Sequence, residues 1–390
     1  MSSSNVVNHR RLCVFCGKPP SAKTREHVIP QWLIERTGSP SRLAHFGYSR
    51  DEELEPLRFA FNSFVFPACA KCNEEFGKLE DRTVPIMESL LRAEPIGALE
   101  FSVLLDWFDK VRIGVWLGLN AIEKNPFSLT PRYFIKQRFR NRDRLVFIYR
   151  LEGLGPGLTL VGTFAPSFAF APVAIGMRVN DLLFINASTV TLCARRLGFP
   201  FVDDISWAPQ EMLETSWAEG LHRTFNPVLR KNPFPKGGTQ IFQPVFPPNL
   251  DGALHDADYV KKRTLDRHSG LGGIYIEASR QRSWCVDKKK IDWCPDQKHS
   301  ADHLARLAFI TIIGFQLADF THMLSIPDDD QERSARLMSL YERIRADNFA
   351  LGQVVVQQAR QESSAGSTRL AKELQRTIAL PHFARAGTRR

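Results

Sequence analysis

The sequence predicts an α+β fold in which a small cysteine-bearing module precedes a larger mixed α/β region. Three observations support this prediction. Two identically spaced cysteine pairs lie within the first 72 residues, residues 101–122 carry apolar side chains at helical spacing, and short segments between 132 and 186 have the two-residue period of strands. A chain of 390 residues is long enough for two or three domains.

The composition excludes several classes of protein. Hydrophobic residues make up 43% and charged residues 24% of the chain, which is ordinary for a globular protein and excludes wholesale disorder and a coiled coil. The longest apolar run, Leu307–Ala318, is about half the ~20 residues that a membrane span needs. The sequence does not open with a basic segment followed by an apolar one, so we expect a cytoplasmic protein.

The charge is unevenly distributed. The net charge is +10, yet residues 1–100 carry 13 basic and 13 acidic side chains, so the whole excess lies in residues 101–390. A basic body favours an anionic partner, most often a nucleic acid.

Four of the seven cysteines indicate a zinc site. Cys13 and Cys16 form one C-x-x-C pair, and Cys69 and Cys72 form a second. Each pair can supply two thiolates from one tight turn, and two pairs complete the tetrahedron of a structural zinc site. The alternative is that one pair is fortuitous and buried as small apolar side chains.

A polar motif lies between and directly after these pairs. Glu26 and His27 are followed by Val28-Ile29-Pro30, and Asn73 comes directly after the last cysteine. The combination resembles the zinc-bearing branch of the HNH endonuclease family over residues 11–95. The resemblance implies a treble-clef-like ββα-metal module, a β-hairpin followed by a helix around one divalent metal.

The resemblance also implies roles for particular residues. His27 would be the general base, and Glu26 and Asn73 would bind a catalytic Mg²⁺ or Mn²⁺. The family more often has Asp or His where Glu26 stands. Its middle asparagine, which orients the histidine, has no clear match, and Asn62 is the candidate. The alternative for His27 is a histidine that only packs or forms hydrogen bonds. Glu80 would be an extra ligand or, as we favour, an ion-pair partner.

Basic residues near the motif and in the body are candidate nucleic-acid contacts. Lys23 and Arg25 precede the motif, and Arg132, Lys136 and Arg138 would share one face of a strand if residues 132–151 form a β-hairpin. The alternative for Lys23 and Arg25 is solvated surface charge, and the alternative for the hairpin is an exposed basic edge that prevents aggregation.

The expected organisation divides the chain into four parts. Residues 11–95 form the nuclease module, 96–130 a helical connector, 131–362 an α+β nucleic-acid-binding or partner domain, and 363–390 a basic flexible tail. Helices are expected over 73–80, 84–92, 101–122 and 299–323. A second zinc site is conceivable at the four side chains of Cys285, Cys294, His299 and His303, although coincidence is the favoured explanation of their spacing.

These observations predict a metal-dependent HNH endonuclease that hydrolyses DNA phosphodiester bonds, with RNA not excluded as a substrate. Such a layout suggests an anti-phage defence effector, with a short prokaryotic Argonaute as one conceivable partner. The alternative is a non-catalytic, zinc-stabilised module that binds nucleic acid or protein.

Overall fold

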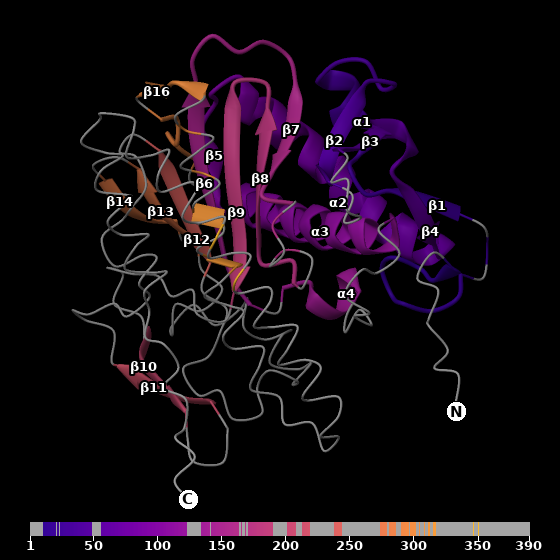
Figure 1. Cartoon of the computed structure of the whole chain (residues 1–390). Helices are drawn as coiled ribbons and strands as arrows, with labels where there is room; N and C mark the ends of the chain where they lie inside the picture. The colour runs from indigo at the N-terminus through magenta and orange to yellow at the C-terminus, as the bar shows by residue number, and fades with distance from the viewer. Residues whose placement is uncertain are drawn as a thin grey trace, which may run out of the picture.

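The computed structural model shows a mixed α/β protein in which one long helix, α3 (Ala98–Ile122), lies between a small N-terminal module and a large sheet (Figure 1). The structure describes residues 11–20, 22, 24–48, 56–122, 134–140, 142–163, 165, 168, 171–189, 201–207, 213–218, 238–243, 274–278, 281–285, 290–295, 297–301, 304, 308, 311–312, 315–316, 346 and 350. None of the helices in this part of the chain combines the length and apolar character that a bilayer crossing requires.

The N-terminal module is built on a two-stranded antiparallel sheet followed by a helix. Its elements are β1 (Thr24–His27), α1 (Gln31–Arg36), β2 (Leu43–Tyr48), β3 (Pro56–Ala60), η2 (Phe61–Ser63), β4 (Val65–Ala68) and α2 (Ala70–Leu91). Strand β1 pairs with β4, so that His27 lies opposite Val65 and Thr24 lies opposite Ala68. The motif and the helix that carries Asn73 therefore belong to one compact unit.

Helix α2 is continuous, so the prediction of two helices over 73–80 and 84–92 was wrong. Pro85 lies inside the helix and cannot donate a backbone hydrogen bond. The apolar side chains of Leu79, Ile86 and Leu90 nevertheless continue along the helix on both sides of Pro85, and all three are buried. Because α2 packs along α3 (Ala98–Ile122), burial of this stripe on both sides of Pro85 favours one helix over two.

The larger region is a sheet whose described strands run in the order β14-β13-β12-β6-β9-β8-β7, with β16 parallel to β6. Its strands are β6 (Asp143–Leu151), β7 (Leu158–Val161), β8 (Ala174–Val179), β9 (Leu182–Thr189), β12 (Thr239–Gln243), β13 (Ile274–Ala278), β14 (Gln281–Cys285) and β16 (Lys298–His299). Separate short pairings join β10 (Phe201–Trp207) with β11 (Leu213–Ala218) and β5 (Ile96–Gly97) with β15 (Lys290–Ile291).

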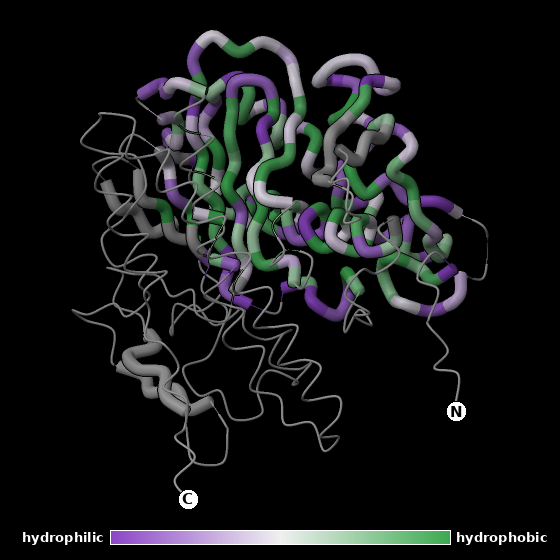
Figure 2. Tube along the Cα trace, viewed as in Figure 1, coloured by the Kyte–Doolittle hydropathy of each residue, from purple (hydrophilic) through white to green (hydrophobic). Residues whose placement is uncertain are grey.

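Helical segments cover both faces of the sheet. Phe184 of β9 contacts Phe108 of α3 with ring centroids 5.4 Å apart. Phe147 of β6 points to the opposite face of the sheet, where its ring centroid lies 6.5 Å from that of Phe315. Described positions between 301 and 316 are helical, as predicted, although His299 belongs to β16. Hydrophobic residues accordingly concentrate along α3 and the central strands (Figure 2).

The predicted hairpin over residues 132–151 is only half correct. Its second strand is β6, but Ile135–Arg138 form the short helix α4. The Gln137 side chain accepts a hydrogen bond from the Phe134 backbone N–H at 2.7 Å and caps this turn. In a helical turn Lys136 and Arg138 point in nearly opposite directions, so the predicted shared strand face does not exist.

A buried ionic cluster fastens α3 to the sheet. Asp106 and Asp109 of α3 both contact Arg144 of β6, with distances from Nη1 of 2.5 Å and 3.2 Å. Arg112 donates to Asp109 at 2.5 Å and to the Pro172 carbonyl at 2.8 Å. These charges are almost completely buried and mutually paired, so they require α3 to keep one position on the sheet.

Two glycines let α3 approach the N-terminal module closely on another side. A Cβ atom at Gly114 would lie 2.8 Å from Val28, and one at Gly118 would lie 2.8 Å from the ring of Phe66. Both positions lie within a well-packed interior, where the neighbouring side chains have little room to move.

Replacing Gly118 with alanine should therefore lower the free energy of unfolding by about 1–3 kcal/mol, the usual cost of overpacking. Chemical denaturation measures this change. The matched control is Gly77→Ala in α2, where a Cβ atom meets nothing within 4 Å and better helix propensity should add about 0.5–1 kcal/mol. Equal effects of the two substitutions would contradict the close approach.

Candidate functional site

Four sulfur atoms converge at the start of α2. The Sγ atoms of Cys13, Cys16, Cys69 and Cys72 all lie within 4.8 Å of one another. Cys16 and Cys69, which are 53 residues apart in sequence, have Sγ atoms 3.8 Å apart. A tetrahedral zinc site with Zn–S bonds of about 2.3 Å places its sulfurs about 3.8 Å apart, whereas a disulfide requires about 2.05 Å. The four cysteines can thus hold a metal ion such as zinc.

Backbone groups shape this cluster. Cys13 accepts a hydrogen bond on Sγ from the Cys69 backbone N–H at 3.2 Å, and Gly17 closes the first turn in the left-handed region with φ +72°. Cys69 is the N-cap of α2, so its partner Cys72 lies in the first turn, where the helix dipole favours negative charge.

The cluster has the electrostatic character of a cation site. Burial and the negative charge of Cys13 raise the pKa of the Cys72 thiol to about 12. Four thiolates at such close range are therefore unfavourable at neutral pH without a cation to neutralise them. A bound Zn²⁺ would supply that charge and join the two segments covalently.

Helix α4 braces the first cysteine pair from outside the module. The Ile135 and Lys136 backbone N–H groups donate to the Val14 and Phe15 carbonyls at 3.2 Å and 2.9 Å. The Lys136 ammonium forms an ion pair with Glu75, and its positive charge also lowers the pKa of Cys72. Lys136, which we predicted to contact nucleic acid, instead lies beside the thiolate cluster.

The other predicted nucleic-acid contacts differ in their accessibility. Arg25 on β1 is exposed and can reach a phosphate. Arg138 is 3% exposed and donates to the Ser188 carbonyl at 3.2 Å, so the prediction that it contacts nucleic acid does not fit the structure. Lys23 and Arg132 lie outside the described residues.

His27 ends strand β1 in a half-buried position. Its Nδ1 atom is buried and has no hydrogen-bond partner within the described part of the chain. Burial lowers the pKa of His27 below 6.5, the charges of Arg25 and Lys110 lower it further, and Glu80 partly opposes them. The imidazole is therefore neutral at pH 7 and can accept a proton.

Glu26 belongs to an ion cluster that we call the Glu26–Lys110–Glu80 triad. The Lys110 ammonium, 1% exposed, forms ion pairs with the carboxylates of Glu26 and Glu80. Burial raises the pKa of Glu80, and the Glu26 charge adds to this effect while Lys110 opposes it. Glu80 is thus the ion-pair partner that we favoured from the sequence.

Sequence reasoning missed Lys110. The signal that could have identified it is the presence of charged residues within the apolar helical stretch 101–122. A helix this apolar cannot be assumed to have a face in contact with water, so its charged residues need buried partners.

The two asparagines differ in their surroundings. Asn73 has a buried Oδ1 atom without a hydrogen-bond partner among the described residues. It precedes Glu80 by two turns, or about 10 Å along the axis of α2. Asn62 is exposed in η2, and the described structure shows no hydrogen bond between its side chain and His27.

Only part of the conceivable second zinc site lies within the described residues. The Cys294 thiol accepts a hydrogen bond from Arg150 at 3.7 Å, and the His299 ring packs edge-on against Tyr149 at 5.6 Å. The His303 position and the Cys285 side chain lie outside the described residues. Within the described residues, the four N-terminal cysteines are the cluster of potential metal ligands that we find.

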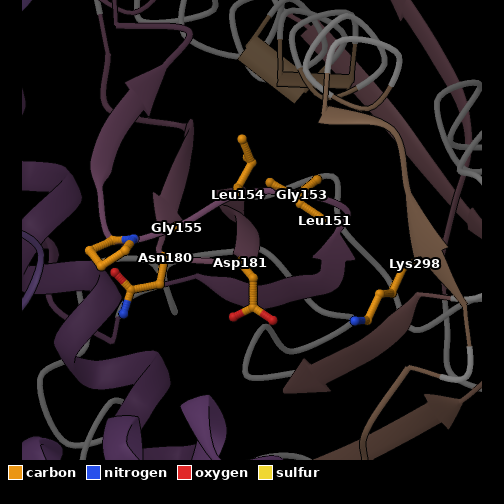
Figure 3. A pocket seen from close by; sticks show the side chains of 8 residues that line it. Leu151, Gly153, Leu154, Gly155, Asn180, Asp181 and Lys298 are labelled. Atoms are coloured by element: carbon orange, nitrogen blue, oxygen red, sulfur yellow. The ribbon is translucent and has the colours of Figure 1, made fainter.

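A depression of about 450 Å³ lies beside the connections between β6 and β7 and between β8 and β9 (Figure 3). It is lined by Leu151, Gly153, Leu154, Gly155, Pro156, Asn180, Asp181 and Lys298. The Asp181 carboxylate is already paired with Arg150 at 2.9 Å. None of the predicted site residues lines this depression, so it does not enter the function that we propose.

We expect the purified chain to contain one zinc ion, and Cys72→Ser to remove it. Loss of the fourth ligand should lower the stability of the module by several kcal/mol, because a structural zinc site contributes directly to folding. Elemental analysis and thermal unfolding measure the two effects. The control Cys294→Ser should keep its zinc; equal zinc content in both variants would show that the metal is bound elsewhere.

Comparison with known proteins does not identify this site. Neither a protein-family model, nor a curated protein, nor a solved structure matches the chain. The roles of Glu26, His27 and Asn73 therefore have to be inferred from their own contacts and chemistry.

Proposed function

We propose that the chain is a metal-dependent HNH-type endonuclease whose N-terminal module is held together by zinc. The observation that carries the proposal is that β1, β4 and α2 form one connected unit. The strand that ends in His27 pairs with β4, and β4 leads through Cys69 into α2, whose first turn holds Cys72 and Asn73. A zinc ion at the four thiols would fix this strand pair relative to the helix.

His27 is suited to act as a general base. Phosphodiester hydrolysis requires a group that removes a proton from water near pH 7, and a half-buried neutral imidazole with a lowered pKa meets that requirement. Its Nδ1 atom has no partner among the described residues, so the ring is not committed to a structural hydrogen bond through that nitrogen.

Two oxygen donors of the motif suit a hard divalent cation such as Mg²⁺ or Mn²⁺. These are the Glu26 carboxylate, next to His27 in sequence, and the Asn73 Oδ1 atom in the first turn of α2, which is buried without a hydrogen-bond partner in the described structure. Such a cation, when bound, would clamp the scissile phosphate and stabilise the leaving oxygen. Thiolates suit zinc better, so the cysteine cluster is assigned a structural role.

The basic body and the exposed Arg25 support a nucleic-acid substrate. DNA is the substrate that we propose, and competition between DNA and RNA would identify the preferred one. The proposal extends to a role in anti-phage defence with a protein partner such as a short prokaryotic Argonaute, which co-purification with neighbouring gene products would test.

One observation favours the second candidate function, a zinc-stabilised binding module without catalysis. Glu26 is 8% exposed and already ion-paired with Lys110. A carboxylate that is buried and paired in this way is less accessible to a catalytic metal.

Plasmid nicking in the presence of Mg²⁺ or Mn²⁺ distinguishes the two functions. His27→Ala should reduce the rate by about 10²–10⁴-fold, the usual contribution of a general base, while zinc content stays unchanged. The matched control is His45→Ala on β2, a histidine of the same module outside the motif. Cleavage by His27→Ala at the wild-type rate would favour the binding module.

The pH dependence of cleavage provides a second test. Only the neutral imidazole accepts a proton, so kcat/KM should rise with pH through the pKa of His27. Because burial lowers this pKa below 6.5, the rise should be complete by about pH 7. A rate that still increases above pH 8 would contradict the assignment of His27 as the base.

A further inference from the structure

The Lys110 ammonium contacts two carboxylates from different elements, Glu26 of β1 and Glu80 of α2. It is 1% exposed, so it cannot touch a bound nucleic acid and can act only through its two partners. We propose that Lys110 is a positioning residue of the nuclease site, which holds Glu26, and with it His27, against α2. This inference rests on the proposed function.

Strand β1 needs such an anchor. It has four residues and pairs with β4 alone among the described strands, and an isolated two-stranded sheet is marginally stable. The Thr24 hydroxyl bonds to the Ala68 carbonyl, which ties the strand only to its own partner. Among the described side chains of β1, Glu26 is the one with an ion pair to a neighbouring helix: it pairs with Lys110 of α3, which also pairs with Glu80 of α2.

A second observation places Lys110 on the face of α3 that meets the strand pair. Lys110, Gly114 and Gly118 are spaced by four residues and therefore share one helix face. Positions 114 and 118 approach Val28 and Phe66, which belong to the segment after His27 and to β4. The same face thus contacts the motif by close packing and by charge, and α3 is itself fixed to the sheet by its aspartates.

The charges of the triad decide which variants are informative. Wild type has two carboxylates and one ammonium, a formal charge of −1. Lys110→Met alone leaves two carboxylates buried without a cation, and this variant could fail to fold for that reason. Lys110→Met combined with Glu80→Gln restores a formal charge of −1 and keeps side chains of similar volume, but removes the anchor of Glu26.

The experiment compares wild type, the double variant and the control Lys78→Met, an exposed lysine on α2 paired with Glu74. Plasmid nicking with Mn²⁺ supplies kcat and KM, hydrogen–deuterium exchange reports on the amides of residues 24–27, and elemental analysis supplies the zinc content. We expect the double variant to keep its zinc, lose at least 30-fold in kcat with KM within threefold of wild type, and exchange at least tenfold faster at β1. Lys78→Met should match wild type throughout.

The alternative outcomes separate the two proposals. Wild-type kcat and exchange in the double variant would overturn the positioning role and leave the nuclease proposal intact. Loss of zinc or unfolding of the double variant would show that Lys110 serves general stability and would also overturn the role. If wild type does not cleave while β1 of the double variant exchanges faster, the nuclease proposal fails and the anchoring of β1 by Lys110 stands.

Discussion

The convergence of four thiols from two distant segments is the constraint on which the N-terminal module depends. Cys16 and Cys69 are 53 residues apart in the chain, yet their sulfur atoms approach to 3.8 Å. The intervening elements α1, β2, β3 and η2 are short, and the two-stranded β1–β4 sheet is too small to be stable alone. A metal ion at the cysteines would close this long loop and hold β1 against the start of α2.

Helix α3 connects that module to the rest of the protein because its buried charged groups have partners in both. Asp106 and Asp109 bind Arg144 of the sheet, and Lys110, the next residue in sequence, binds Glu26 and Glu80 of the module. Buried charges tolerate little displacement, because a buried charge that moves away from its partner has no water to solvate it instead. Through these contacts, α3 holds the strand that carries His27 in a defined position relative to the sheet.

Sequence reasoning succeeded where the signal was local and failed where burial decided the outcome. The cysteine spacing, the helix over 101–122 and the strands after residue 143 follow from local periodicity and turn residues, and the structure has them. Helix α2 runs through Pro85, and α4 replaces a predicted strand, because contacts with α3 and with the first cysteine pair outweigh local preference. The burial of Arg138 likewise follows from packing and not from its local sequence.

The sequence alone determined that four cysteines pair by spacing and that Glu26, His27 and Asn73 accompany them, because ligand spacing is a property of neighbouring residues. The tertiary structure decided which charged side chains remain available to bind a substrate or a metal ion. Arg138 is buried and donates to a backbone carbonyl, Lys136 lies beside the thiols, and Glu26 is ion-paired with a lysine more than eighty residues away in sequence. Electrostatic partners of this kind are set by how helices and strands pack, and no local pattern encodes that packing.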